Sequence, residues 1–340
     1  MIREPAVRRL RHPGLFRQDR VDRRVRQEVA VDRYRLGHQA VPIHQPRALG
    51  IRCQLQFLLQ RRRHPQRHLR HHVRPDRSGQ RHLRFAGLFR DALACDVTIA
   101  AQTPADAERF RALGVAPAAV HVTGNIKFDL EVPEDVRRLG SHIRAEFAHR
   151  PVWIAGSTHE REEDIVLDAH ERVRAARSDA LLVLVPRHPN RFDAVKAWLR
   201  SRNVRFVSRS TREAVTSDTS VLLVDTLGEL LSFYAAANVA FVGGSLVPVG
   251  GHNLLEPAAL NRPIIVGPHT FNAADIAQNF LESGAAVRVE SATELGSAVL
   301  DLLTNAARRD QMIARAHEIL QNNRGTLARL LALIERLLRR

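Results

Sequence analysis

The sequence predicts an α/β fold in which a parallel β-sheet is covered by helices on both faces. Two observations lead to this prediction. Short runs of Val, Ile and Leu recur after residue 150, for example at 181–185, 239–242 and 264–266. Segments with helical periodicity separate these runs. Uninterrupted apolar strands that alternate with helices are typical of a parallel sheet buried on both faces.

The first expected elements lie between residues 96 and 122. Residues 96–101 form a strand candidate, and Thr103 followed by Pro104 supplies an N-cap and a proline at the first helical position. Gly114 is expected to end that helix. Residues 120–122 form a second short strand candidate.

From residue 151 onward, strands and helices alternate regularly. Ser157 and Glu160 fit a capping box, which predicts a helix from Ser157 to about residue 176. Residues 292–338 are expected to be helical. This order predicts a Rossmann-type domain with a helical tail. The other expected elements are strands at 152–155, 181–185, 204–207, 221–224, 239–242, 264–266 and 286–289, and helices at 191–200, 229–236, 254–260 and 273–283.

The 340 residues are enough for two domains. We expect residues 151–340 to form the Rossmann-type domain and residues 136–150 to be a polar linker that contains a helix. Residues 81–135 are expected to be the remnant of an incomplete N-terminal domain. Residues 1–80 form a separate Arg-rich segment.

The net charge of +16 is concentrated in that segment. Residues 1–80 contain 20 Arg and 6 acidic residues, a net charge of +14, whereas the other 260 residues carry a net charge of only +2. A basic arm that binds RNA is one interpretation. We favour another, a translation in the wrong reading frame, because neither helical nor strand periodicity is sustained there. We therefore expect no nucleic-acid partner and little contribution of residues 1–80 to a compact fold.

Several other classes of protein are disfavoured by the sequence. The sequence contains no run of about 18 apolar residues, so we expect no membrane-spanning helix. Met1 to Arg11 is basic, but no apolar stretch follows, so a secretory signal is not expected. Cys53 and Cys95 lack the spacing of metal ligands, which favours a reduced cytoplasmic protein without a metal site.

The strongest candidate site follows the strand 239–242. Two glycine pairs lie there, and a helix is expected to begin near Asn253, with Glu256 in its first turn. Glycines allow a ligand to approach the backbone, and the amides of a helix start suit a phosphate. Glu256 could accept hydrogen bonds from ribose hydroxyls, or it could merely complement the helix dipole. The candidate donor or phosphate loop comprises Ser157, Thr158, Gly243, Gly244, Ser245, Gly250, Gly251 and His252.

Three further candidates are weaker when each is taken alone. Arg187, after the strand 181–185, can offer a cationic fork to phosphate or can be a solvated turn residue. The amide of Gly228, at the start of the helix 229–236, could contact a pyrimidine edge, although Thr226 and Glu229 could equally cap that helix. Lys127 is one of two lysines in the chain, which indicates a need for a compact ammonium group or a plain surface position.

The order and spacing of these motifs resemble the 3-deoxy-D-manno-octulosonic acid (Kdo) transferase family of Gram-negative bacteria, which has the GT-B fold. About three quarters of the chain takes part in this resemblance, and the segment 243–257 is rarely shared outside the family. The resembling segments are 101–110, 123–129, 155–159, 185–189, 226–230, 243–257, 263–268 and 271–272.

The resemblance implies transfer of Kdo from CMP-Kdo to the lipid A precursor, with inversion, at the cytoplasmic face of the inner membrane. No cofactor is implied. Lys127 matches the family lysine that stabilises charge during transfer. The family's CMP contacts match Pro186, Arg187, Leu227, Gly228, Glu229, Asn253, Leu254, Leu255 and Glu256.

The sequence also departs from the family pattern. The family has a hydrophobic membrane-anchoring helix, a glutamate general base and a later Glu-Leu-Trp-Pro-like stretch in its first domain. No Trp precedes Trp153, and residues 49–59 contain no acid. We therefore assign no general base, and we expect no membrane anchor and no measurable Kdo transfer by this chain.

Two alternatives stay open at this stage. One is a different GT-B enzyme, such as a UDP-sugar transferase or a 2-epimerase, since these share the sheet and the glycine-rich turn. The other is a non-catalytic fragment that binds a nucleotide.

Overall fold

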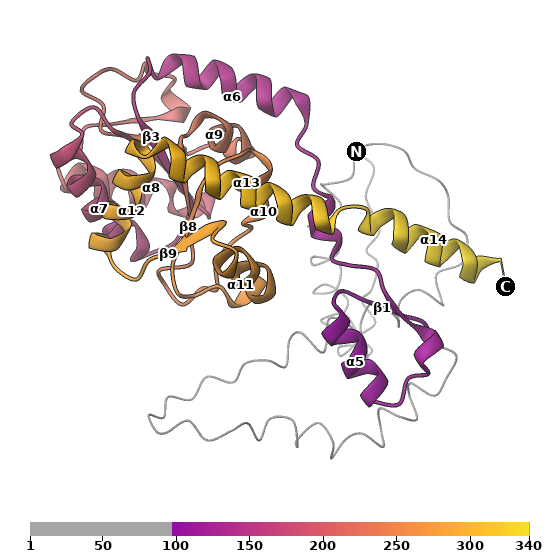
Figure 1. The fold of residues 1–340 in the computed structure, drawn as a ribbon. Helices are drawn as coiled ribbons and strands as arrows, with labels where there is room; N and C mark the ends of the chain where they lie inside the picture. The colour runs from indigo at the N-terminus through magenta and orange to yellow at the C-terminus, as the bar shows by residue number, and fades with distance from the viewer. Residues whose placement is uncertain (1–96, 340) are drawn as a thin grey trace, which may run out of the picture. The chain divides into compact units, whose positions relative to one another are not determined.

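The computed structural model describes residues 97–339, and its main feature is a parallel sheet of seven strands (Figure 1). The strand order is β5-β6-β4-β3-β7-β8-β9, and every neighbouring pair is parallel. The predicted α/β class with a Rossmann-type parallel sheet is therefore confirmed for this part of the chain. The strands are β3 (Val152–Thr158), β4 (Leu181–Pro186), β5 (Phe206–Ser208), β6 (Val221–Leu223), β7 (Val239–Val242), β8 (Ile264–Val266) and β9 (Ala286–Arg288).

Helices cover both faces of this sheet. On β3, Trp153 faces α7, α8 and α12, whereas Ile154 faces α6 and α9. The strands are apolar on both sides for this reason. The helices are α6 (Glu134–Glu146), α7 (Glu162–Ala176), α8 (Phe192–Ser201), α9 (Leu230–Ala236), α10 (Leu255–Ala259), α11 (Ala274–Glu282), α12 (Ala292–Thr304), α13 (Ala306–Asn323) and α14 (Thr326–Leu338).

The helix expected within the polar linker is present as α6, and it packs against α9. Ile143 at its end and Phe147 just beyond are each 1% exposed and join the same apolar cluster as Phe233. This helix is therefore an integral layer of the sheet domain.

A second, smaller sheet precedes α6. It pairs β1 (Ile99–Ala101) with β2 (Val120–Val122) in parallel, and the helix α5 (Pro104–Ala112) connects them. The Thr103 side chain caps α5 by accepting from the Asp106 N–H, and Gly114 follows the helix with φ +95°. The predicted cap, proline and terminating glycine are all confirmed.

The chain then forms a short 3-10 turn, η3 (Ile126–Asp129), against which the last helix packs. The Asp129 carboxylate accepts the backbone N–H groups of Gly325 and Leu327, at the start of α14. Arg329 donates to the Thr123 carbonyl at 2.9 Å. The C-terminal helix is thereby joined to the segment that follows β2.

Two predicted elements are wrong in detail. The expected capping box at Ser157 does not exist, because β3 continues to Thr158 and α7 begins only at Glu162. Ser157 lies in a bulge of the β3–β4 pairing with φ +61°, and the N-cap position of α7 is occupied by Arg161 instead. The fifth strand is Phe206–Ser208, shifted from the expected 204–207.

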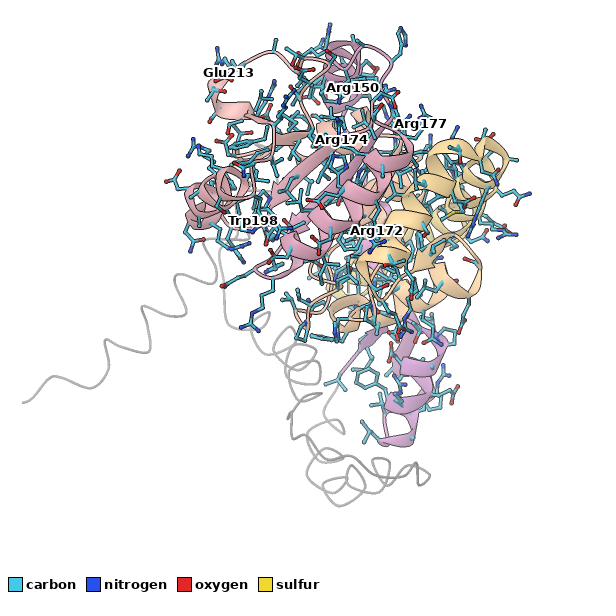
Figure 2. The ribbon with its side chains drawn as sticks, turned by 90° about the vertical axis from the view of Figure 1, so that its left-hand side faces the viewer. Arg150, Arg172, Arg174, Arg177, Trp198 and Glu213 are labelled. Carbon is cyan, nitrogen blue, oxygen red and sulfur yellow. The ribbon has the colours of Figure 1, made fainter. Side chains whose placement is uncertain are left out.

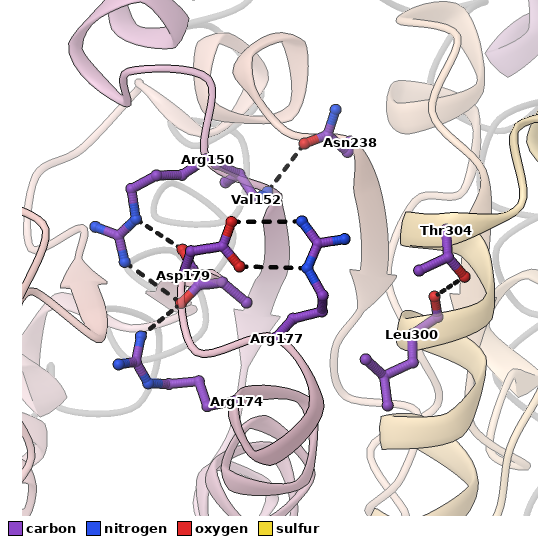
Figure 3. A network of polar contacts seen from close by, with 9 residues as sticks. Arg150, Val152, Arg174, Arg177, Asp179, Asn238, Leu300 and Thr304 are labelled. Carbon is purple, nitrogen blue, oxygen red and sulfur yellow. Dashed lines mark hydrogen bonds and ion pairs between the residues drawn. The ribbon is translucent and has the colours of Figure 1, made fainter.

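The amino edge of the sheet is closed by arginines (Figures 2 and 3). Arg150, just before β3, donates to the Asp179 carbonyl at 2.8 Å. It also donates to the carbonyls of Thr216 at 2.8 Å and Thr219 at 2.7 Å. Arg174 shares the Ala180 carbonyl with it. These bonds satisfy buried backbone acceptors at the strand starts.

Among the described residues, no helix has the length and apolar character needed to cross a membrane. The predictions made for residues 1–80 concern a part of the chain outside the described residues.

Candidate functional site

The strand order reverses between β3 and β7. Strands β4, β6 and β5 lie on one side of this pair, and β8 and β9 lie on the other. In open α/β sheets, ligands bind beyond the carboxyl ends of the strands at such a switch point. The loop after β3 and the glycine-rich turn after β7 therefore lie next to each other at the expected position.

Glu162, the first residue of α7, joins these two loops. Its carboxylate accepts the backbone N–H groups of Gly244 at 2.7 Å, Ser245 at 3.0 Å, Leu246 at 2.9 Å and His159 at 3.2 Å. The side chain is fully buried. Burial raises the pKa of Glu162, and the four N–H donors act in the opposite direction. Each oxygen accepts two N–H groups, a pattern that fits the ionised carboxylate.

This contact changes the role of the predicted phosphate loop. The amides of Gly244 and Ser245 are already used by Glu162, so they are not free to hold a phosphate. The Ser245 hydroxyl is likewise engaged, donating to the Val242 carbonyl and accepting from the Gly267 N–H at 2.8 Å. Our sequence reasoning missed Glu162. An acidic residue at a helix start suggests only a favourable interaction with the helix dipole.

The second glycine pair is also held inside the protein. The N–H groups of Gly250 and Gly251 donate to the Gly244 carbonyl at 3.1 and 2.8 Å. A Cβ on Gly250 would lie 2.4 Å from the Phe271 ring. The Asn272 amide donates to the Gly251 carbonyl at 3.1 Å. These glycines allow the turn to pack tightly against the segment after β8.

Ser157 and Thr158 contribute to the wall of the site. Both side chains are buried, and the Thr158 hydroxyl donates to Glu163 at 3.0 Å. Glu163 in turn forms a two-bond ion pair with Arg191, at 2.7 and 3.0 Å. We infer that these residues set the position of the loop from inside.

Histidines gather where the two loops meet. The Nε2 atoms of His159 and His252 lie 2.8 Å apart, and the His188 ring stands edge-on to His159 at 5.3 Å between centroids. Burial, followed by the charges of His159, Arg187 and His188, lowers the pKa of His252 to about 4. Burial also leads the causes that lower the pKa of His159, ahead of His188, Arg191 and Arg187.

Pro186 and Arg187 lie at the end of β4, beside this cluster. The Arg187 N–H donates to the Thr158 carbonyl at 2.9 Å, and the side chain is exposed. An exposed guanidinium at the carboxyl edge of the sheet is available to an anionic ligand.

The turn after β6 also lies at the carboxyl edge of the sheet. Leu227 is 72% exposed, and Gly228 has φ +83° with open space around it. Glu229 accepts from Arg209 at 3.0 Å and also from Thr226. Partial burial opposes the charge of Glu229, but these hydrogen bonds outweigh it and lower the pKa. The Glu229 side chain is thus engaged within the protein, whereas the Leu227–Gly228 turn is open.

The start of α10, which follows the glycine-rich turn, also contributes to this edge. The Asn253 side chain accepts the Leu255 N–H at 3.1 Å and donates to Glu256 at 3.3 Å. The side chains of Leu254 and Leu255 are core residues, 1% and 0% exposed. Only their backbone can meet a ligand.

Lys127 lies in η3, and its side chain is exposed. The Asn125 side chain caps this turn by accepting the Lys127 N–H at 3.1 Å. Lys127 therefore belongs to the segment after β2, whereas the other site candidates lie at the carboxyl edge of the larger sheet.

A cavity of about 770 Å³ lies elsewhere, lined by residues of α11, β9 and α13 that include Arg288, Arg308 and Arg315. None of the predicted site residues lines this cavity. We therefore keep the carboxyl edge of β3 and β7 as the candidate site. Within the described residues, no group of three or more His, Cys, Asp or Glu side chains is placed to hold a metal ion.

Comparison with known proteins adds to this geometry. Residues 74–130 match the family model of 3-Deoxy-D-manno-octulosonic-acid transferase (kdotransferase). A 3-deoxy-D-manno-octulosonic acid transferase of Haemophilus influenzae is 41% identical over 71% of this chain and 57% of that protein. The protein of the same name from Bordetella pertussis is 40% identical over 73% of this chain and 58% of that protein. The chain thus spans less than two thirds of the length of these relatives.

A solved structure covers the sheet domain. The C-terminal CMP-Kdo binding domain of WaaA from Acinetobacter baumannii matches with 34% identity and a TM-score of 0.54, over 56% of this chain and 100% of that domain. Together with the sequence relatives, this match shows that the chain belongs to the 3-deoxy-D-manno-octulosonic acid (Kdo) transferase family of glycosyltransferases.

Proposed function

We propose that the sheet domain of this chain binds CMP-Kdo at the carboxyl edge of β3 and β7, as the donor half of a Kdo transferase in lipopolysaccharide synthesis. The observation that carries this proposal is the alignment of the whole CMP-Kdo binding domain of the Acinetobacter relative with this sheet domain. The acceptor would be the lipid A precursor at the cytoplasmic face of the inner membrane.

Each part of the edge has a role in this proposal. Arg187 offers its exposed guanidinium to the phosphate, next to Pro186. The open Leu227–Gly228 turn receives the cytosine through its backbone, and Glu229 supports this turn from within. Asn253 and Glu256 hold the ribose hydroxyls, with the backbone of Leu254 and Leu255 between them.

Lys127 is proposed to stabilise the charge that develops as Kdo leaves CMP. A positioned ammonium group lowers the energy of negative charge that develops on the leaving phosphate. We have assigned no general base within residues 97–339, so donor binding, and not transfer, is the appropriate measurement for this chain.

Isothermal titration calorimetry with CMP and with UDP tests the proposal. We expect CMP to bind and UDP to bind more weakly. Arg187→Ala and Glu256→Ala should each weaken CMP binding by about 1–3 kcal/mol, because each strands a hydrogen-bonded charge partner. Arg205→Ala is the matched control, since Arg205 forms an exposed ion pair with Asp218 before β5 and β6.

Tighter binding of UDP than of CMP would favour another GT-B transferase or an epimerase. If both variants keep the CMP affinity of the wild type and their fold is intact by circular dichroism, Arg187 and Glu256 do not contact CMP and have structural roles only. Absence of nucleotide binding would reject the proposed function.

A further inference from the structure

His159 and His252 form a hydrogen bond that connects the two loops of the candidate site. Their Nε2 atoms are 2.8 Å apart and their ring planes are inclined by 7°. Two imidazole nitrogens at this distance must share a single proton, because one Nε2 donates its N–H and the other accepts with its lone pair. With both nitrogens protonated, two N–H groups would face each other.

The backbone around this pair is held in place. The Glu162 carboxylate accepts the His159 N–H and the amides of the turn at 244–246. Gly244 has φ +67°, and a Cβ there would lie 3.1 Å from the His252 ring. A larger residue at Gly244 would therefore press on the ring. The distance between the two imidazoles is thus set by the surrounding structure.

The charged groups that act on the pair are basic. They are His188 and Arg187 from the loop after β4, and Arg191 from the turn η4 (Pro189–Arg191). Arg191 is already paired with Glu163, and Glu162 faces the backbone N–H of His159 rather than its ring. A second proton on the pair is therefore disfavoured while no anion is bound.

We propose that the His159–His252 pair is a proton-coupled clamp for the phosphate of the donor, so that phosphate binding draws one proton from solvent onto the pair. The Nε2–H···Nε2 hydrogen bond then breaks, and two Nε2–H···O bonds to phosphate oxygens replace it. The phosphodiester keeps its single negative charge, and the pair gains one positive charge. This inference rests on the proposed function and assigns the phosphate end of the same site.

Proton uptake by the pair makes the affinity for the donor phosphate depend on pH. An anion close to an imidazole favours its charged form, so the pKa of the pair should rise in the complex. The affinity should therefore increase as the pH falls from 7.5 to 5.5, by roughly three- to tenfold per pH unit, as expected for uptake of up to one proton.

The experiment uses calorimetry with the methyl ester of CMP as the probe, at pH 5.5, 6.5 and 7.5, in two buffers of different ionisation enthalpy. The ester is chosen because its phosphate does not titrate in this range, unlike a phosphate monoester with a second pKa of about 6. We expect uptake of up to one proton from the difference between buffers. Cytidine, which lacks the phosphate, is the ligand control and should bind without proton uptake.

Two variants separate the pair from its neighbour. His252→Asn retains a hydrogen-bonding side chain but removes one titrating ring, so it should bind the ester with little pH dependence. His188→Asn is the matched control, because it lies in the same cluster outside the pair, and it should retain the proton uptake.

Ester binding without proton uptake, or equal uptake by the wild type and His252→Asn, would overturn the clamp and leave the proposed donor site intact. Loss of uptake in His188→Asn alone would assign the proton to His188 and reject the pair. No binding of either ligand at any pH would reject both proposals.

Discussion

At the scale of single residues, Glu162 provides the main link between the two loops of the site. A buried carboxylate is costly unless its oxygens are fully hydrogen-bonded, and here four backbone N–H groups meet that need. The glycine-rich turn after β7 is therefore preformed around an internal anion. The groups available to a ligand are therefore the neighbouring imidazoles and the Arg187 side chain, and not the amides of this turn.

We predict that Glu162→Gln destabilises the protein by about 3 kcal/mol, since an amide cannot accept all four N–H groups and buried donors are left unsatisfied. Urea unfolding followed by circular dichroism measures this change. Glu160→Gln is the control, because Glu160 lies in the same loop and is exposed, and it should change stability by less than about 0.5 kcal/mol. Equal effects of the two substitutions would contradict the role given to Glu162.

At the scale of elements, the two edges of the sheet have different purposes. The carboxyl edge carries the loops of the site. The amino edge is closed by Arg150, which is 9% exposed and donates to the two carbonyls that precede β4 (Figure 3). Arg150 also donates to the Thr219 carbonyl, which precedes β6. The Asn238 side-chain oxygen accepts a hydrogen bond from the Val152 N–H at 2.9 Å, which links the starts of β7 and β3.

We predict that Arg150→Met, which keeps most of the apolar stem, costs about 3 kcal/mol of stability because several buried carbonyls lose their donors. Arg177→Met is the control: Arg177 and Asp179 form an ion pair whose side chains are 40% and 52% exposed, so its loss should cost less than about 1 kcal/mol. Denaturant midpoints of the two variants give the comparison. If Arg150→Met loses no more stability than Arg177→Met, water molecules replace the guanidinium as hydrogen-bond donors to these carbonyls.

At the scale of the whole molecule, the response to acid depends on a buried histidine. His170 on α7 is 1% exposed. Its Nδ1 accepts the Trp153 indole N–H at 3.0 Å, and its Nε2 lies 2.9 Å from the Ser220 carbonyl. The ring is therefore the Nε2–H tautomer, and a proton on Nδ1 would displace the indole. Burial is the main cause that lowers the pKa of His170 to about 3.

The sign of the pH effect follows from this lowered pKa. The unfolded chain binds a proton at His170 near pH 6.5, whereas the folded protein does so only near pH 3. The stability due to the neutral ring is thus complete above pH 6.5 and is lost as the pH falls towards 3, by about 5 kcal/mol in all.

We predict that the free energy of unfolding decreases steadily between pH 6.5 and 4, as measured by urea titration at each pH. His170→Gln should be less stable than the wild type at pH 7. Its free energy of unfolding should fall less steeply with decreasing pH, by a slope that corresponds to close to one proton. The same slope in both proteins would place the acid sensitivity elsewhere, for example at His252, whose pKa is lowered to about 4.

Much of the fold could be predicted from local pattern. The strands Val120–Val122, Val239–Val242 and Ile264–Val266 have the expected bounds, because short apolar runs between polar or turn-forming residues permit few other assignments. The cap of α5 was predictable for the same reason, since Thr103 and Pro104 act within one helical turn. The Ser157 capping box failed because a neighbouring strand extended β3 through that residue.

The strand and helix segments, and the resemblance that led to the family, could be recognised without the structure, because they depend on residues close together in the chain. The folded structure established the strand order, which brings residues 157–162 beside residues 243–254. It also decided that Glu162 occupies the amides of the glycine turn and that His159 meets His252, 93 residues away. Such contacts depend on packing between distant segments, and no local propensity encodes them.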